Sequence, residues 1–503
     1  MKRNLTLYIV ALLLLTSAVL NALTLKEHLD AAPKPVFKEG HTLPPLARWG
    51  WSMPYDVTVE LCESWGYALE FGSYATTSAA EKAHDPETRQ GKVCALTKSN
   101  PERYPLFVIT DRPLKDMEKA EELPESYWLH NAEGKRLEGP SWKRRNPEAP
   151  DEIFQRVAEK TIAPLKRIQE ICPITVILHG GESGLTELGH SRKFLEQDPA
   201  AVKARGDRSW WDFYSEHKAR WLMPTISAIR KTFPDRKVLI WYHFGGMPGW
   251  AGKSWSWNYE YMKTVADTPG QSIYYKHFNS GWTGKQDLLS NFLCSVAQAK
   301  TYDDSLSYNW VCAGWGERKF SDIDRYTGFL KCLYTAGAIG NVAGYFSLPE
   351  GFKGQDVGDE PPNHLQQMMA LGRVQALFSH LEEFLRQGSL LPGPLKHKNS
   401  NAADLPAYEF PTGDETARVL IRKHNTSDRW LVTAWAADGD ARNVSVEIPG
   451  LEPIEVLARP EGSVYIVSVK SSVAYEPPKV EVKLLDVDGM HPSKGMKKII
   501  NAK

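Results

Sequence analysis

Several familiar signals are missing from this sequence, and each absence excludes a class of function. The 61 basic and 61 acidic residues give no net formal charge, so no overall field would attract nucleic acid or anionic lipid. Neither a GxGxxG sequence after the first expected strand nor a P-loop sequence is present, which removes the main support for nucleotide binding. The six cysteines form no CxxC pair and no Cys/His cluster with zinc spacing, so we expect neither a metal nor a cofactor.

The composition is that of an ordinary globular protein with many aromatic residues. The 503 residues are 42% hydrophobic and 24% charged, which excludes disordered, collagen-like and coiled-coil classes. The length allows two domains, because an α/β barrel takes about 250 residues or more as one unit. The 17 Trp, 20 Tyr and 17 Phe supply flat apolar faces that suit sugar rings as well as protein cores.

The N-terminus has the pattern of an export signal. Lys2 and Arg3 precede an apolar run over 5–20, and small residues lie near the end of this run. We therefore expect residues 1–22 to be a signal peptide and the mature protein to be secreted or periplasmic. An uncleaved membrane anchor is the alternative, because the run is just under the length of a membrane span. No later segment is apolar enough to cross a bilayer, so no membrane association is expected after signal removal.

An oxidising compartment would allow some of the cysteines to pair. Cys62, Cys172, Cys294 and Cys332 lie in helix-like apolar patterns, for which buried free thiols are the alternative. The spacing of the cysteines does not define which of them would pair.

The first 390 residues or so alternate between two kinds of segment. Short apolar, β-branched or aromatic runs are followed by longer amphipathic runs, which is typical of a parallel sheet with crossover helices. Eight strands are expected, at 47–53, 67–74, 106–110, 174–179, 237–243, 272–278, 306–313 and 342–347. Helices are expected at 58–65, 153–171, 210–233, 259–266, 288–299, 323–338 and 364–386. Eight such units predict a closed (β/α)8 TIM barrel, placed in a catalytic domain over 23–394.

A second domain is expected after the proline-containing stretch 390–395. Short alternating strands at 418–422, 430–435, 443–448 and 463–469 are separated by Gly, Asp and Asn turns. They predict a small all-β sandwich over 395–475 that packs on the barrel and carries no catalytic residue. Residues 476–503 are rich in Pro and Lys and are expected to form an extended tail.

Acidic residues follow several of the expected strands, where a barrel of this kind carries its chemistry. Glu182 follows the fourth strand in the sequence HGGES, and Glu317 follows the seventh in AGWGE. Glycosidic cleavage needs two opposed carboxylates, one protonating the leaving oxygen while the other attacks the anomeric carbon or activates water. Glu350, after the eighth strand, is the alternative to Glu317. Long insertions at 75–105 and 113–150 are expected to build a cleft at the same end.

With these residues the chain resembles the retaining glycoside hydrolases of clan A, which have an eight-fold βα barrel. The resemblance covers the barrel, over about 46–386, and a β-sandwich appendage is common in the same clan. It implies that Glu182 is the acid/base and Glu317 the nucleophile. It also implies that Tyr275 lies against the nucleophile. Gly181 stands where these enzymes usually have an asparagine.

Three histidines fall near the expected strand ends and are candidates for substrate binding. His179, His243 and His277 suit sugar hydroxyls, or an anionic group on a modified sugar if they are protonated. A three-histidine metal site is the alternative, although no local spacing indicates one. Tyr275 and His277 are two residues apart in one strand, so they are expected to face the same side.

Further acidic and aromatic residues lie near the same ends. Glu70 and Asp111, at the ends of the second and third strands, are expected to bind substrate or to support the structure, and Asp111 to orient a sugar hydroxyl. Three tryptophans flanked by glycine are the best candidates for stacking on sugar rings: Trp250, Trp282 and Trp315.

The leading hypothesis is a secreted glycoside hydrolase that acts on a polysaccharide or oligosaccharide. A barrel that binds carbohydrate without catalysis is an alternative, because a fold alone does not prove activity. A hydrolase or lyase that uses the histidines and Tyr275 is a third reading. The expected partner is a carbohydrate substrate, and no nucleic acid is expected.

Overall fold

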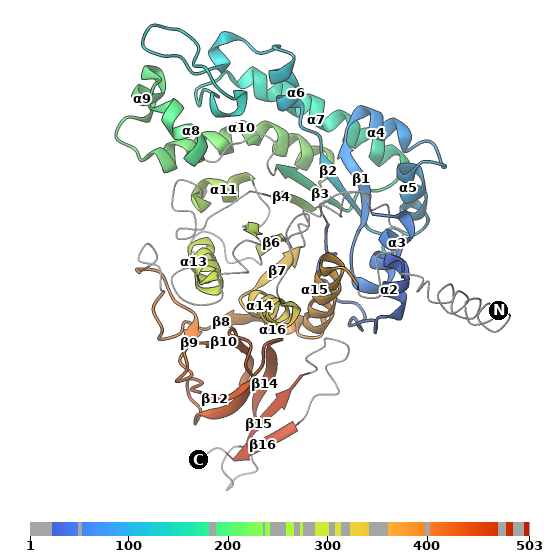
Figure 1. Cartoon of the computed structure of the whole chain (residues 1–503), viewed down its shortest axis with the longest axis vertical. Helices are drawn as coiled ribbons and strands as arrows, with labels where there is room; N and C mark the ends of the chain where they lie inside the picture. Colours follow the sequence, from blue (N-terminus) through green and yellow to red (C-terminus); the bar gives the residue numbers. More distant parts are fainter. Residues whose placement is uncertain are drawn as a thin grey trace, which may run out of the picture.

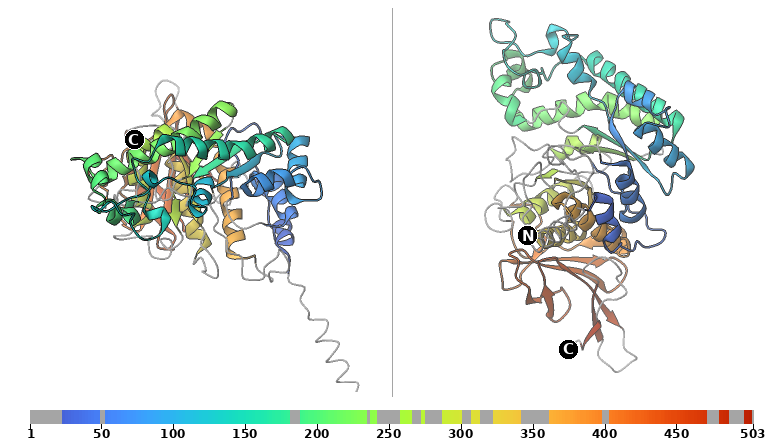
Figure 2. Two further views of the ribbon diagram at one scale, coloured as in Figure 1. Left: turned by 90° about the horizontal axis from the view of Figure 1, so that it is seen from above. Right: turned by 45° about the vertical axis from the view of Figure 1, so that its right-hand side comes forward.

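The computed structural model describes residues 23–48, 53–180, 188–234, 237–241, 258–265, 272–274, 287–300, 307–312, 322–341, 361–397, 403–470, 479–485 and 497–501. These residues form an α/β body followed by an antiparallel module, which lies at one end of the molecule (Figures 1 and 2). No helix in the described ranges combines the length and the apolar character that a membrane span requires.

The α/β body contains two parallel sheets. The first has the order β1 (Leu69–Ala75), β2 (Leu106–Thr110), β3 (Val176–Gly180) and β4 (Lys237–Trp241). The second has the order β5 (Ser272–Tyr274), β6 (Ser307–Cys312) and β7 (Ala338–Asn341). All of these strand pairs are parallel, and Leu46 forms a parallel bridge to Tyr67 just before β1. The fold is thus of the α/β class with consecutive strands as neighbours.

Helices connect these strands. Those of the body are α2 (Leu25–Ala31), α3 (Tyr55–Trp65), α4 (Thr77–Lys82), α5 (Arg89–Ser99), α7 (Asp151–Ile171), α10 (Trp210–Thr232), α11 (Tyr259–Val265), α13 (Leu288–Lys300), α14 (Ile323–Thr335), α15 (Asn363–Ser379) and α16 (Glu382–Gln387). Capping explains several of their starts: the Ser209 hydroxyl accepts from the Asp212 amide at the beginning of α10. In α7 the buried positions recur every three or four residues, including Phe154, Val157, Thr161, Leu165 and Ile168. This spacing gives the helix one apolar face for packing.

The last parallel strand lies earlier in the chain than expected. The sequence predicts a helix over 323–338 and a strand over 342–347, whereas α14 ends at Thr335 and β7 begins at Ala338. Gly337 adopts a φ of 94°, the left-handed conformation that commonly ends a helix and that glycine adopts without strain. Residues 342–347 lie outside the described part of the chain. The pairs that would close the barrel, β4 with β5 and β7 with the first strand, are not among the described ones, so the closed barrel remains a prediction.

Side-chain alternation gives the first sheet two different faces. On one face Ala47, Ala68 and four strand residues form a cluster of their own: Phe107, Ile109, Val176 and Leu178. The intervening residues, such as Leu106, Val108 and Ile177, belong to the cluster that includes the helices α5, α7 and α10. The first face is therefore the inner one and the second is the helix-facing one.

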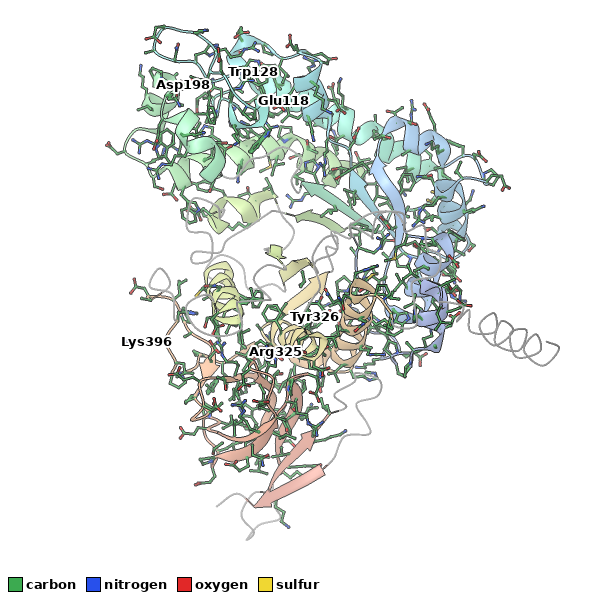
Figure 3. All side chains as sticks on the ribbon, viewed as in Figure 1. Glu118, Trp128, Asp198, Arg325, Tyr326 and Lys396 are labelled. Atoms are coloured by element: carbon green, nitrogen blue, oxygen red, sulfur yellow. The ribbon has the colours of Figure 1, made fainter. Side chains whose placement is uncertain are left out.

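The insertions after β2 and β3 fold together into one lobe. It contains α6 (Pro113–Lys119), η1 (Glu125–Tyr127), η2 (Ser141–Lys143), α8 (Leu188–Leu195) and α9 (Pro199–Arg205). Buried Glu118 accepts from Arg145 at 2.6 and 3.0 Å and from the Tyr127 hydroxyl at 2.6 Å. Asp198 accepts the backbone amide of His130 at 2.7 Å, which links the two insertions (Figure 3). The long loops expected at 113–150 are thus a packed structure with its own core.

The C-terminal module consists of two antiparallel sheets. The larger has the order β16 (Lys497–Asn501), β15 (Lys479–Leu484), β14 (Ser463–Lys470), β11 (Arg429–Ala436), β10 (Ala417–His424) and β8 (Gly388–Leu390), and β9 (Glu409–Phe410) also pairs with β10. The smaller consists of β12 (Arg442–Val446) and β13 (Ile454–Ala458). One apolar cluster joins residues of both sheets, including Val419, Val432, Val444 and Val456. This is the expected arrangement of a small all-β sandwich.

The boundaries expected for this module from the sequence differ from those in the structure. β8 pairs with β10 although it precedes residue 395, and two segments of the expected tail, 479–484 and 497–501, are strands of the same sheet. The prediction of an extended tail is therefore wrong for these two segments. Val480 and Val482 are buried and alternate with polar residues, a period of two that the flanking prolines and lysines obscure in the sequence.

The α/β body and the module share one continuous core. Trp435 of β11 packs against Gly328 of α14, where an added Cβ would lie 2.2 Å from the Trp435 ring. The Lys331 ammonium donates to the Gly462 carbonyl at 2.8 Å. Arg418 of β10 forms buried ion pairs with Asp287, at the start of α13, and with Glu409. The junction between the two parts therefore combines a shared apolar core with buried polar contacts.

Candidate functional site

A buried charge cluster lies at β1. Glu70 of β1 forms an ion pair with Arg48, and both side chains are about 95% buried. Arg89 of α5 lies 3.8 Å from the same carboxylate and donates to the Thr58 hydroxyl at 2.9 Å. Gly72, with a φ of 106°, makes room for Arg89, because an added Cβ would lie 3.0 Å from its Nε. Glu70 is thus held by two cations from different elements, which favours the structural role over direct substrate contact.

Replacing Glu70 by Gln should strongly destabilise the fold. The change removes the carboxylate that pairs with buried Arg48 and lies close to Arg89, and removing one partner of a buried ion pair costs about 3–5 kcal/mol. Urea unfolding followed by circular dichroism would measure this loss. The control is Glu63→Gln, which removes a more exposed ion pair with Arg103 and should cost less than about 1 kcal/mol. Equal stability of the two variants would contradict this role of Glu70.

His179, expected to bind substrate, lies at the end of β3 and is buried. Its Nδ1 is 2.7 Å from the Thr110 hydroxyl at the end of β2. Alternation along β3 puts His179 on the same side as Ile177, which faces the helices. Burial lowers the pKa of His179 to about 4, so the imidazole is neutral near pH 7. Its visible function is to link the ends of two neighbouring strands.

The buried neutral state of His179 predicts a pH dependence of stability. An unfolded histidine takes up a proton near pH 6.5, whereas folded His179 does so only near pH 4. The contribution of neutral His179 to the free energy of unfolding is therefore fully present above pH 6.5. It is lost as the pH falls towards 4, by at most about 3 kcal/mol. Urea unfolding at pH 7 and at pH 4.5 measures how much stability each chain loses between these pH values. We expect the His179→Gln variant to lose less than the parent chain. His84→Gln, at an exposed histidine, is the control and should leave the loss unchanged.

Asp111 occupies the inner side of the same strand ends. It directly follows β2, and the alternation that puts Phe107 and Ile109 on the inner face assigns Asp111 to it as well. Its carboxylate accepts the Arg112 amide at 2.8 Å, and burial raises its pKa. The Arg112 guanidinium lies over the Tyr74 ring at 4.2 Å. All three side chains are half-buried, so together they form a polar, partly accessible group at the ends of β1 and β2.

Most of the expected site residues lie outside the described part of the chain. They are Glu182, Glu317, Glu350, His243, Tyr275, His277, Trp250, Trp282 and Trp315. Of those described, Asp111 and His179 end neighbouring strands but belong to opposite faces. Among the described residues, no group of three His, Cys, Asp or Glu side chains could hold a metal ion.

Sequence reasoning did not identify Arg48, Arg89, Tyr74 or Arg112. Arg48 could have been recognised as a charged residue at the start of an otherwise apolar expected strand, and Arg112 as the neighbour of Asp111. Arg89 has no local signal, because its role depends on how α5 packs against β1.

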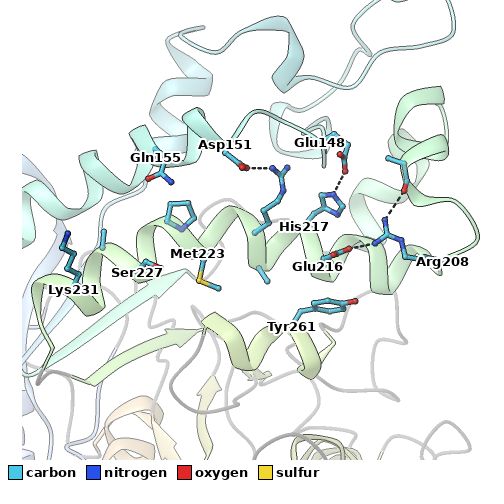
Figure 4. Close-up of a pocket in the computed structure, with 15 residues that line it drawn as sticks. Glu148, Asp151, Gln155, Arg208, Glu216, His217, Met223, Ser227, Lys231 and Tyr261 are labelled. Carbon is cyan, nitrogen blue, oxygen red and sulfur yellow. Dashed lines mark hydrogen bonds and ion pairs between the residues drawn. The ribbon is translucent and has the colours of Figure 1, made fainter.

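A cavity of about 1020 Å³ lies elsewhere in the body, between α7, α10 and α11 (Figure 4). Its acidic groups are paired with neighbouring cations: Asp151 with Arg220, and Glu216 with Arg208. His217 contacts Glu148 through Nε2 and the Phe213 carbonyl through Nδ1, at 2.7 Å for the latter. The pair of Asp151 and Arg220 joins α7 to α10. The cavity is separate from the group around Asp111.

Comparison with known proteins gives similarity in structure only. No family model matches the sequence, and no curated protein matches it. A solved structure described as a glycoside hydrolase is similar, with a TM-score of 0.44 and 10% identity over 93% of this chain and 91% of that one. The endo-β-1,4-mannanase from Thermotoga petrophila gives a TM-score of 0.38 at 10% identity, covering 95% and 94%.

An α-amylase from Lactobacillus plantarum is also similar, with a TM-score of 0.40 and 8% identity over 75% of this chain and 81% of that chain. The backbone of the chain thus resembles the backbones of several glycoside hydrolases. Overlap of this extent assigns neither an activity nor a substrate to it.

Proposed function

We propose that the chain is a glycoside hydrolase whose active site lies at the carboxyl ends of the parallel strands. The observation that carries this proposal is the half-buried group of Asp111, Arg112 and Tyr74 on the inner side of these ends. Such a combination of carboxylate, guanidinium and aromatic ring suits the hydroxyls and apolar faces of a sugar. In parallel α/β folds the carboxyl ends of the strands are where ligands bind.

The proposed catalytic pair comes from the sequence around these ends. Glu182 follows the last residue of β3 by two positions, and Glu317 follows the last residue of β6 by five. Glu182 would protonate the leaving oxygen, and Glu317 would attack the anomeric carbon, with Glu350 as the alternative nucleophile. His243, His277, Tyr275 and the three glycine-flanked tryptophans would contact the substrate. Asp111 would accept a hydrogen bond from a sugar hydroxyl.

The proposed mechanism retains the configuration of the anomeric carbon. A direct attack requires the two carboxyl groups to lie about 5–5.5 Å apart, which leaves no room for a water between them. Glu182 must be protonated near neutral pH while Glu317 stays ionised, so their surroundings must shift the two pKa values apart. The proposal also includes export, with residues 1–22 as the signal peptide.

Incubation of the purified chain with a panel of polysaccharides and oligosaccharides tests this function. Release of reducing ends, with the products separated by chromatography, is the expected result. Proton NMR of the first product then shows which anomer forms first, and retention is expected. An inverted anomer would exclude the covalent intermediate, and binding without turnover across the panel would indicate a non-catalytic carbohydrate-binding protein.

A further inference from the structure

The cavity between α7, α10 and α11 runs along one side of α10 (Figure 4). Its lining residues on this helix recur every three or four positions and include Glu216, Arg220, Met223, Ser227 and Lys231. The helix rises by about 22 Å from Glu216 to Lys231, so the cavity extends over several helical turns. This stripe is distinct from the one that packs in the cluster of the first sheet, which includes Leu222, Ile226 and Ile229.

Apolar and aromatic groups form part of the lining. Ala219, Met223, Pro224 and Ala228 of α10 contribute aliphatic surface. Tyr261 of α11 contributes an aromatic ring, which is half-buried and packs in part against the cluster of the first sheet. The rest of the Tyr261 side chain faces the cavity (Figure 4). The cavity thus offers one flat ring beside a row of small apolar side chains.

Groups that can form hydrogen bonds line the same cavity from two helices. Gln155 of α7, and Ser227 and Lys231 of α10, are exposed and contact no hydrogen-bonding or ionic partner among the described residues. Asp151 contacts Arg220 through Oδ1, and Glu216 contacts its arginine through Oε2. Because each carboxylate has a second oxygen, both pairs can still accept hydrogen bonds. The cavity therefore combines donors and acceptors with charges that are largely compensated.

We propose that this cavity is a second binding site for a neutral polysaccharide, outside the proposed active site. A sugar ring has apolar faces and an edge of hydroxyls, which match the Tyr261 ring and the surrounding polar groups. The length of the cavity along α10 suits several consecutive sugar residues of a chain. The proposal rests on the proposed function, since it takes the substrate of the enzyme as the ligand. Binding here would keep the enzyme on its substrate and raise the local substrate concentration at the active site.

Native electrophoresis through gels that contain a soluble polysaccharide tests the proposal. The full chain is run in the cold through separate gels with starch, galactomannan, xylan or barley β-glucan, and through a gel without polysaccharide. We expect at least one of the four to slow the parent chain, and the dependence on polysaccharide concentration gives an apparent Kd. A parent chain that none of the four slows would overturn the proposal.

Two substitutions assign the binding to this cavity. Tyr261→Ala removes the aromatic ring and should raise the apparent Kd at least about fivefold. Ser227→Trp adds bulk at an exposed position in the cavity and should weaken binding without removing a buried side chain. The matched control is Tyr55→Ala, because Tyr55 is also half-buried and packs against the same cluster but does not line the cavity. It should keep the parent Kd.

Turnover of the same polysaccharides separates this proposal from the proposed function. Binding that Tyr261→Ala and Ser227→Trp weaken, without turnover by the parent chain, would support the cavity and remove the hydrolase activity. Turnover together with binding that neither substitution changes would overturn the cavity as a glycan site and leave the hydrolase activity intact.

Discussion

A chain that ends at Arg386 is expected to be recovered almost entirely in insoluble form. The deletion removes the whole antiparallel module and uncovers the apolar surface that α14 presents to Trp435. It also leaves Asp287 without Arg418, its buried ionic partner. Burying apolar surface is the main favourable term in folding, so exposing a shared core leaves the remaining body without sufficient stability. The amount of soluble protein and its circular dichroism spectrum are the measurements.

The matched control for this deletion is a chain that ends at Leu485. Of the described elements it removes only β16, which lies at the edge of the sheet and, among the described strands, pairs with β15. This chain should remain soluble, with a moderately lower Tm. A stable, well-folded chain ending at Arg386 would show that the α/β body folds independently, and that the contacts of Trp435 and Arg418 contribute little.

Glu182→Gln is expected to lower kcat on a natural glycan by about a thousandfold or more while substrate binding is retained. The amide keeps the shape of the side chain but cannot donate a proton to the leaving oxygen. The loss should be much smaller for an aryl glycoside with a nitrated leaving group, because such a group departs without protonation. Steady-state kinetics with both substrates separate these cases, and calorimetric titration of the glycan measures binding.

Glu187→Gln is the control for this substitution, because it makes the same change five positions along the chain. It should leave kcat within about twofold of the parent value. A Glu182→Gln variant with unchanged turnover on the natural glycan would remove Glu182 from the mechanism. Equal losses for the natural and the nitrated substrates would instead indicate damage to the fold or a role other than acid catalysis.

The sequence predicted the elements of the α/β body well, because their signals are local. β2 was expected at 106–110 and lies there, since five apolar or β-branched residues are bounded by proline and aspartate. The helix α7 was expected at 153–171 and spans Asp151–Ile171, because its apolar period is regular. β15 and β16 were missed, because two short strands among prolines and lysines have no hydrophobic run long enough to indicate them.

The candidate site was less accessible to sequence reasoning, because it depends on the packing of distant segments. Asp111 could be placed at a strand end from its position after an apolar run. The buried contacts of Arg48 and Arg89 with Glu70 could not be predicted from the sequence, because α5 approaches β1 only in the folded chain. His179 shows the same limit: its position at a strand end was predicted, but the strand face on which it lies depends on register.

The position of β16 at the edge of the larger sheet has a consequence for the behaviour of the protein in concentrated solution. An edge strand presents unpaired backbone groups that could join the edge of a second copy. β16 begins with Lys497 and Lys498, and its neighbour β15 carries Lys479 and Lys483. Two copies joined at this edge would bring further lysines into the same sheet, and lysine in an edge strand opposes such pairing because like charges repel each other. We therefore expect the lysines of β16 to oppose fibre-like self-association through this sheet.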